Sequence, residues 1–242
     1  MGKQMTRVAG LDLAAGRGRS ALAALDLDAA SGRLQCVAHQ HPVGSDAEIV
    51  EALCALGPEV LAIDAPLSLP ATVAAALSIP GAPRLSMLPD DASPYLRAAE
   101  RDPLWRRLGV RPLPVSFLGG LTFRALVLLP CLRATLPETA IIEAFPSGAL
   151  AALGITRSDD GEHSGPRRAK TTAEARAAVQ RGLARYISGL PERTDVPLDA
   201  DRLDALACAL TAMAYLRGTY DAAGEVAEGQ IMVPFVSEQD LS

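Results

Sequence analysis

The sequence has few aromatic residues, few cysteines and no long hydrophobic run. Phenylalanine, tryptophan and tyrosine together make up 4% of the 242 residues, and the four cysteines form no CxxC pair. Scattered cysteines inside apolar segments predict buried free thiols in a reducing compartment. No apolar stretch approaches the ~20 residues of a membrane-spanning helix, and Asp12 interrupts the first apolar run. We therefore expect a soluble, cytoplasmic protein that binds no membrane.

Several motifs that identify common enzyme classes are also missing. The chain contains no GxxxxGK[ST] phosphate-binding loop, no GxGxxG dinucleotide fingerprint and no GxSxG nucleophile elbow. Dinucleotide binding and serine hydrolase chemistry therefore have no support. A strongly basic composition would indicate nucleic acid directly, but the formal net charge is −5. Any nucleic-acid binding would need a local basic patch.

The residues that are present predict a mixed α/β fold. Hydrophobic residues make up 49% of the chain, which is enough for a sizeable core. Strands are predicted at residues 7–14, 20–27, 33–43, 60–63 and 139–145. Helices are predicted at residues 45–56, after Ser93-Pro94, at 119–136, 171–187 and 198–215, with a candidate short strand near 231–233.

An antiparallel meander followed by crossover helices and buried strands predicts a mixed five-stranded sheet with helices on both faces. The Ser45–Glu48 and Thr171–Glu174 spacings are those of capping boxes, and they open two of the helices. We expect a single domain over residues 1–242, with a loop and helical segment inserted around residues 65–135.

Carboxylates lie near the ends of the buried strands. Asp12 lies in the first strand, Asp64 closes the fourth and Glu143 lies late in the fifth. The last helix adds Asp201 and Asp204, which share one helical face near its N-terminus. Clustered carboxylates repel one another, and a divalent cation relieves the repulsion. The pattern predicts a Mg²⁺ or Mn²⁺ site, in which two ions about 4 Å apart would serve phosphodiester chemistry.

Each acid also has a plainer interpretation. A lone aspartate at a strand end is usually a turn former or a helix cap. Asp201 alone fits a helix cap better than a ligand, and Glu143 alone could pair with an arginine. The joint placement of three strand-end acids and a helical pair favours the metal site.

The same segments resemble the motifs of domain-of-unknown-function family 429. They are GLDLA at 10–14, IDAPL at 63–67, IEAFP at 142–146, DRLDALACA at 201–209, and GQI at 229–231 with Pro234. The resemblance implies a predicted nuclease with a ribonuclease-H-like fold. It implies that Asp12, Asp64, Glu143 and Asp204 are catalytic and hold metal, with Asp201 as a further ligand. The Asp-x-x-Asp helix is also similar to that of Holliday-junction resolvases, which share the fold.

A run of arginines could supply the basic patch. Its members are Arg97, Arg101, Arg106, Arg107 and Arg111. The family that the chain resembles also carries an arginine- and aspartate-rich stretch here. The resemblance therefore makes Arg101 and Arg106 the candidate substrate-binding residues, as contacts to phosphate. The alternative is a solvated helix face with i,i+4 ion pairs. Trp105 and Phe117 lie nearby and could stack on bases, but the low aromatic content favours core packing.

Three functional hypotheses follow. The first is divalent-metal-dependent hydrolysis of a phosphodiester in nucleic acid or in a small phosphoester. The second is an ATP-dependent phosphotransferase of the acetate-kinase, sugar-kinase and actin superfamily. The length leaves little room for its two lobes, and a second phosphate-binding glycine hairpin is missing. The third is a non-catalytic nucleic-acid-binding scaffold of the same fold. The oligomeric state stays open.

Overall fold

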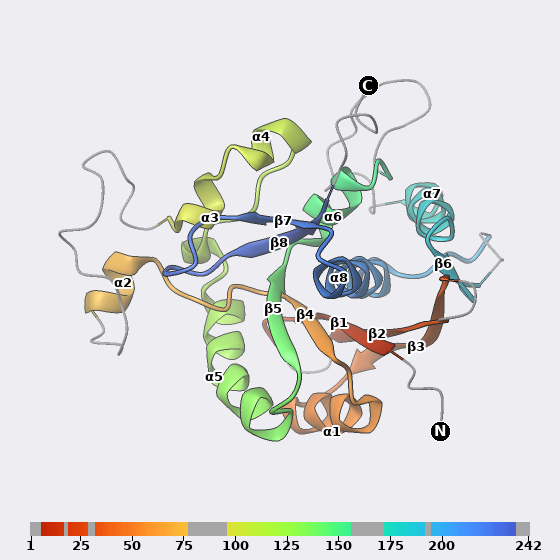
Figure 1. Ribbon diagram of the computed structural model, residues 1–242, viewed down its shortest axis with the longest axis horizontal. Coiled ribbons are helices and arrows are strands. Elements are labelled where there is room, and N and C mark those ends of the chain that lie inside the picture. The colour runs from red at the N-terminus through yellow and green to blue at the C-terminus, as the bar shows by residue number, and fades with distance from the viewer. Residues whose placement is uncertain are drawn as a thin grey trace.

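A computed structural model describes residues 6–16, 19–28, 32–76, 96–155, 172–191 and 195–235 (Figure 1). Its strands are β1 (Thr6–Asp12), β2 (Ser20–Leu27), β3 (Leu34–Val43), β4 (Val60–Asp64), β5 (Ala140–Ala144), β6 (Ile187–Ser188), β7 (Tyr220–Ala223) and β8 (Ile231–Pro234). They form one sheet in the order β6-β3-β2-β1-β4-β5-β8-β7. Strand β2 is antiparallel to β1 and β3, whereas β1, β4, β5 and β8 are parallel. The central order β3-β2-β1-β4-β5 is the predicted ribonuclease-H-like arrangement.

The strand count of five was wrong, because the sheet described here has eight strands. Strand β6 adds two residues beside β3. The antiparallel pair β7 and β8 extends the sheet beyond β5, and β8 confirms the candidate strand near residues 231–233. Strands of two to four residues are too short to give a clear alternation of apolar and polar positions, so two of these three escaped the sequence analysis.

Helices cover both faces of the sheet, as predicted. They are α1 (Asp46–Leu56), α2 (Ala71–Ala76), α3 (Ala98–Arg101), α4 (Leu104–Leu108), α5 (Gly119–Thr135), α6 (Pro146–Ala152), α7 (Ala173–Leu183) and α8 (Ala200–Leu216). Helices α6, α7 and α8 share one apolar core with the sheet, and α1 and α5 share a second core on the other face. The sheet curls around α8, so that β7 and β8 lie on one side of it and β1 to β3 on the other (Figure 1). None of the described helices is long and apolar enough to cross a bilayer.

Local signals account for several helix starts. The capping box predicted for α1 is present, because Ser45 Oγ accepts from Glu48 N and the Glu48 carboxylate accepts from Ser45 N. Helix α7 begins one residue later than predicted, with Thr172 as its cap, and Thr171 lies outside the described residues. Helix α8 is capped by Asp199, whose carboxylate accepts from Arg202 N at 2.8 Å. Asp201 is therefore not the cap. Ser93 and Pro94 lie outside the described residues.

A third apolar cluster joins the segment between β4 and β5 to the β7–β8 pair. It contains Ala99 and Leu104 from this segment and Ala223, Ile231 and Val233 from the two strands. Trp105 belongs to the same cluster and is 3% exposed, so its predicted core role is confirmed. Phe117, in contrast, is 79% exposed. The cluster anchors helices α3 and α4 against the outer strands.

Candidate acidic site

The centre of the sheet places Asp12 and Asp64 side by side. They are register partners at the ends of the parallel strands β1 and β4. Residues paired in this way point to the same face, and neighbouring strands lie about 4.8 Å apart. Val8 and Ala62, which alternate with them along the two strands, belong to the core under α8. Both carboxylates therefore lie on the α8 face, half-buried.

Helix α8 crosses that face close to β1. A Cβ atom at Gly10 would meet the backbone of Ala205 and Ala209, so glycine lets the helix touch the strand. At the other end of the helix, Arg217 Nη2 donates to Gly32 O at 3.3 Å. Gly32 lies at the β2–β3 turn, beside the start of β1. The helix thus runs antiparallel to β1, and its first turn points toward Asp12.

This direction brings Asp201 and Asp204 to the level of Asp12. Asp12 lies about 7 Å beyond Gly10 along the strand. Asp204 and Asp201 lie about 1.5 and 6 Å before Ala205 along the helix axis. The four acids of β1, β4 and α8 therefore gather at one end of one face of the sheet. The described residues contain no group of three or more His, Cys, Asp or Glu side chains placed to hold a metal ion. Neither these four acids nor the predicted five therefore form an assembled metal-binding cluster in this structure.

Glu143 lies apart from the other four acids. Its register partner on β4 is Ile63, the neighbour of Asp64, so its side chain leaves the opposite face. Arg97 donates to it twice, with Nη1 to Oε2 and Nη2 to Oε1 both at 2.7 Å. Leu67 N donates to Oε2 at 2.8 Å. The plainer interpretation of this residue, a pair with an arginine, is confirmed.

Burial alone would lower the pKa of the Arg97 guanidinium. The hydrogen bonds and charges of Glu143 and Glu100 outweigh burial and hold that pKa above its ordinary value. Arg97 is 1% exposed, so it does not belong to a surface patch. The role of Arg97 could not be predicted from the sequence, because an arginine three residues before a glutamate is equally typical of a solvated helix face.

The two candidate substrate-binding arginines are exposed. Arg101 ends α3 and Arg106 lies on α4, which both pack on the third apolar cluster. Strand β7, which contacts α3, is three positions from β4 in the sheet. The structure thus places these arginines on the same side of the molecule as the β7–β8 extension.

Another arginine secures the turn after Asp12. Arg124 on α5 donates from Nη1 to Ala14 O at 2.5 Å and to Gly16 O at 3.0 Å. Its Nε donates to Asp46 at 2.8 Å. Ser20 Oγ accepts from Ala14 N at 3.2 Å. These contacts fix the chain as it leaves β1, directly after the candidate ligand.

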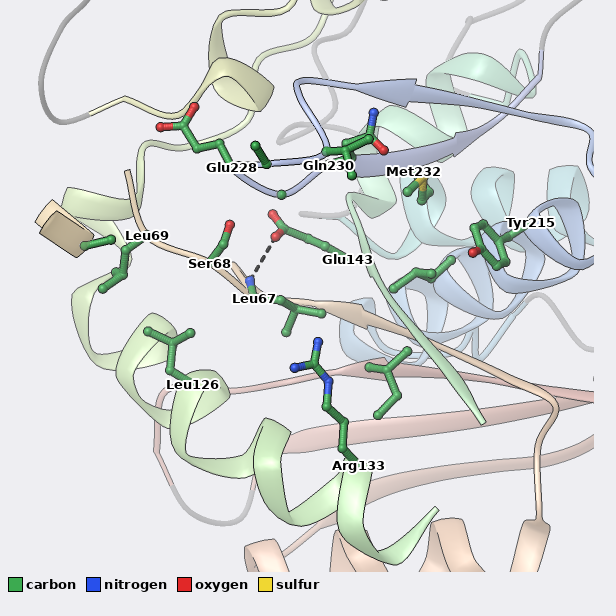
Figure 2. A pocket seen from close by; sticks show the side chains of 16 residues that line it. Leu67, Ser68, Leu69, Leu126, Arg133, Glu143, Tyr215, Glu228, Gln230 and Met232 are labelled. Carbon is green, nitrogen blue, oxygen red and sulfur yellow. Dashed lines mark hydrogen bonds between the residues drawn. The ribbon is translucent and has the colours of Figure 1, made fainter. Parts of the chain in front are cut away.

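A pocket of 590 Å³ opens on the Glu143 side, between α5, β5 and the β7–β8 connection. Figure 2 shows Glu143 at its wall, with the carboxylate turned toward the Leu67 amide. Ser68, Arg133 and Gln230 are among its other lining residues. None of Asp12, Asp64, Asp201 and Asp204 lines this pocket, so the pocket is separate from the Asp12–Asp64 site.

Comparisons with known proteins match one family model, and the similar solved structures include two Holliday junction resolvases. A family model described as "Protein of unknown function (DUF429)" matches residues 10–228. No curated protein matches the chain. T. thermophilus RuvC, solved in complex with a Holliday junction substrate, is 15% identical, with 88% of this chain and 96% of that chain covered and a TM-score of 0.46.

The fowlpox virus Holliday junction resolvase is 10% identical. The alignment covers 88% of this chain and 99% of that chain, with a TM-score of 0.38. The family match extends from β1 to the connection between β7 and β8. It therefore includes all five predicted acidic residues.

Proposed function

We propose that this chain, which belongs to the family of proteins of unknown function DUF429, hydrolyses phosphodiester bonds with Mg²⁺ or Mn²⁺ at Asp12 and Asp64. The observation that carries the proposal is the register pairing of these two aspartates on the α8 face. Asp201 and Asp204, in the first turns of α8, are the proposed further ligands. Carboxylates at adjacent strand ends repel one another, and a divalent cation that accepts both as ligands would relieve this repulsion.

The donor set fits Mg²⁺ or Mn²⁺. Both prefer carboxylate oxygens and water, and Mg²⁺ is usually held by one or two carboxylates together with substrate phosphates. A site with fewer than three converging protein ligands can therefore still bind the metal, because the phosphate of the substrate supplies further ligands. The bound metal would activate water and stabilise charge on the leaving oxygen. The chain's own residues would hold the ion, and α8 would shield one side of it.

The proposed substrate is nucleic acid or a small phosphoester. Arg101 and Arg106 are the proposed phosphate contacts, and their exposure suits that role. An overall charge of −5 repels a polyanion, so local cations are needed for a long substrate. If the side chains of Arg101 and Arg106 contact phosphates, replacing either arginine by alanine will raise KM at physiological salt and reduce the salt dependence of binding.

The test is Mn²⁺-dependent cleavage of a labelled panel. The panel contains single- and double-stranded DNA, RNA, a DNA–RNA hybrid, a branched junction and bis(p-nitrophenyl) phosphate as the small phosphoester. Asp12→Asn and Asp64→Asn are each expected to lower kcat by about 100-fold or more, in the range for loss of a group that acts on the reacting centre. Chelation of the metal should abolish the same cleavage.

Glu51→Gln is the matched control, because Glu51 is an exposed carboxylate on α1, on the opposite face of the sheet. It should cleave at the wild-type rate. Equal activity of wild type and Asp12→Asn would overturn the proposal. Absent cleavage with ATP binding would favour the phosphotransferase, and metal-dependent DNA binding without cleavage would favour the scaffold.

A further inference from the structure

Glu143 and the Asp12–Asp64 pair face opposite sides of the sheet. Asp64 is in register with Asp12, whereas Glu143 is in register with Ile63. Shared coordination needs all ligand oxygens within about 2–2.6 Å of one ion. A metal ion held by Asp12 and Asp64 on the α8 face is separated from Glu143 by the sheet. Glu143 must therefore have a different role from that of a ligand shared with Asp12 and Asp64.

The carboxylate of Glu143 already has a cation. Both of its oxygens accept from the Arg97 guanidinium at 2.7 Å, in the bidentate geometry that makes such pairs strong. Arg97 is 1% exposed and Glu143 is 6% exposed. A metal ion at Glu143 would have to displace the guanidinium and break a buried ion pair, leaving Arg97 with its contact to Glu100 through Nε, which is unfavourable.

The same arginine reaches the chain that leaves β4. Its Nη1 also donates to Ser68 Oγ at 2.9 Å, while Leu67 N donates to Glu143. Leu67 and Ser68 follow Asp64 by three and four residues. Pro66 restricts the backbone between Asp64 and Leu67. One ion pair thus fixes two consecutive residues of the turn that begins at Asp64.

Further acids tie this ion pair to the rest of the segment. Glu100 accepts from Arg97 Nε at 3.0 Å and from Val115 N at 3.2 Å. Glu228 accepts from Ala71 N at 2.8 Å and from Ala98 N at 2.6 Å. These hydrogen bonds hold the starts of α2 and α3 close to the turn.

We propose that Arg97 and Glu143 are positioning residues, which orient Asp64 by holding the Leu67–Ser68 turn, and that Glu143 is not a metal ligand. The inference rests on the proposed function, because it takes Asp64 as the group that is positioned. It differs from the role that the family resemblance implies for Glu143. The ion pair acts from the face opposite the metal and sets the direction of the β4 strand end.

The test compares Glu143→Gln, the double variant Arg97→Met/Glu143→Met and Asp64→Asn in the full chain. Mn²⁺ binding is measured by electron paramagnetic resonance, and exchange of the Leu67 amide by hydrogen–deuterium exchange. The double variant replaces a buried ion pair by apolar side chains, a change that proteins often tolerate. Glu143→Gln keeps an acceptor for the Leu67 amide and provides a second route if the double variant does not fold.

Both Glu143 variants are expected to bind as many Mn²⁺ ions as wild type, whereas Asp64→Asn loses at least one. Cleavage should fall by about 10–100-fold, as for supporting groups of metal sites, with the loss in kcat and not in KM. In the double variant, the Leu67 amide should exchange about tenfold faster, because it loses one hydrogen bond.

Loss of a Mn²⁺ ion in either Glu143 variant would overturn the inference, since it would make Glu143 a ligand. Unchanged exchange at Leu67 in the double variant would overturn it as well. If wild type neither binds Mn²⁺ nor cleaves, the proposed function fails, and the exchange of Leu67 still decides whether the ion pair holds the turn.

Discussion

Gly10 determines how closely α8 approaches the sheet, and thereby where the acids of the helix lie. The helix backbone at Ala205 and Ala209 occupies the space that a side chain at position 10 would need. Because neither a strand nor a packed helix backbone yields easily, any side chain there must push α8 away from β1. The shift would carry Asp201 and Asp204 away from Asp12.

Gly10→Ala is therefore expected to lower the free energy of unfolding by about 1–3 kcal/mol, the usual cost of overpacking. It should also weaken Mn²⁺ binding, because the acidic groups separate. Urea denaturation and metal titration measure the two effects. Gly119→Ala is the control, since a Cβ at Gly119 meets nothing within 4 Å. A Gly10→Ala protein as stable as wild type would contradict the close approach of α8.

At the scale of single elements, register explains why the pairing of Glu143 could not be predicted from the sequence. The long apolar strands and the spacing of Asp201 and Asp204 were visible as patterns. The face of Glu143 depends on a shift of one residue between β4 and β5, which reverses the direction of a side chain. Register is set by tertiary packing, so the strand-end position of Glu143 in the sequence did not reveal its pairing with Arg97.

Hydrogen bonds between neighbouring residues are sufficient to predict the start of helix α1 from the sequence. The exposed carboxylate of Glu48 accepts from the Ser45 backbone and hydroxyl, and these hydrogen bonds lower its pKa. A lowered pKa means that the carboxylate stabilises the fold above the pKa of the unfolded chain, and that this contribution is lost as the pH falls through the folded pKa.

Glu48→Gln should thus reduce stability at pH 7 and have little effect once the pH is well below the ordinary carboxyl value of about 4.3. Urea denaturation at the two pH values measures the difference. Glu51→Gln, at an exposed position of the same helix, should show no such pH-dependent loss. An equal loss at both pH values would show that the charge of Glu48 does not act as a cap.

At the scale of the whole molecule, three apolar clusters share one sheet. The network around Arg97 and Glu228 joins the third cluster to the central strands. The predicted single domain requires that these clusters unfold together, because cooperative unfolding is the mark of one folding unit.

The fluorescence of Trp105, the one tryptophan of the chain, reports on whether the third cluster unfolds together with the other two. It lies in the third cluster, in edge contact with Phe145 and with its Nε1 donating to Ala99 O. Fluorescence and far-ultraviolet circular dichroism should give the same urea midpoint. A fluorescence change at lower urea than the loss of helix signal would show that the segment between β4 and β5 forms a separate unit.

The position of α8 in the chain has a consequence for biosynthesis. All five central strands are complete once the ribosome has passed Ala144, but the helix that covers their common face begins only at Ala200. Until then, the nascent chain exposes apolar strand faces such as Val8, Ala62 and Ile142, which α8 later buries. Chaperones would bind such surfaces during translation. The acids of β1 and β4 are also synthesised well before those of α8, so under the proposed function the metal would bind late in the maturation of the protein.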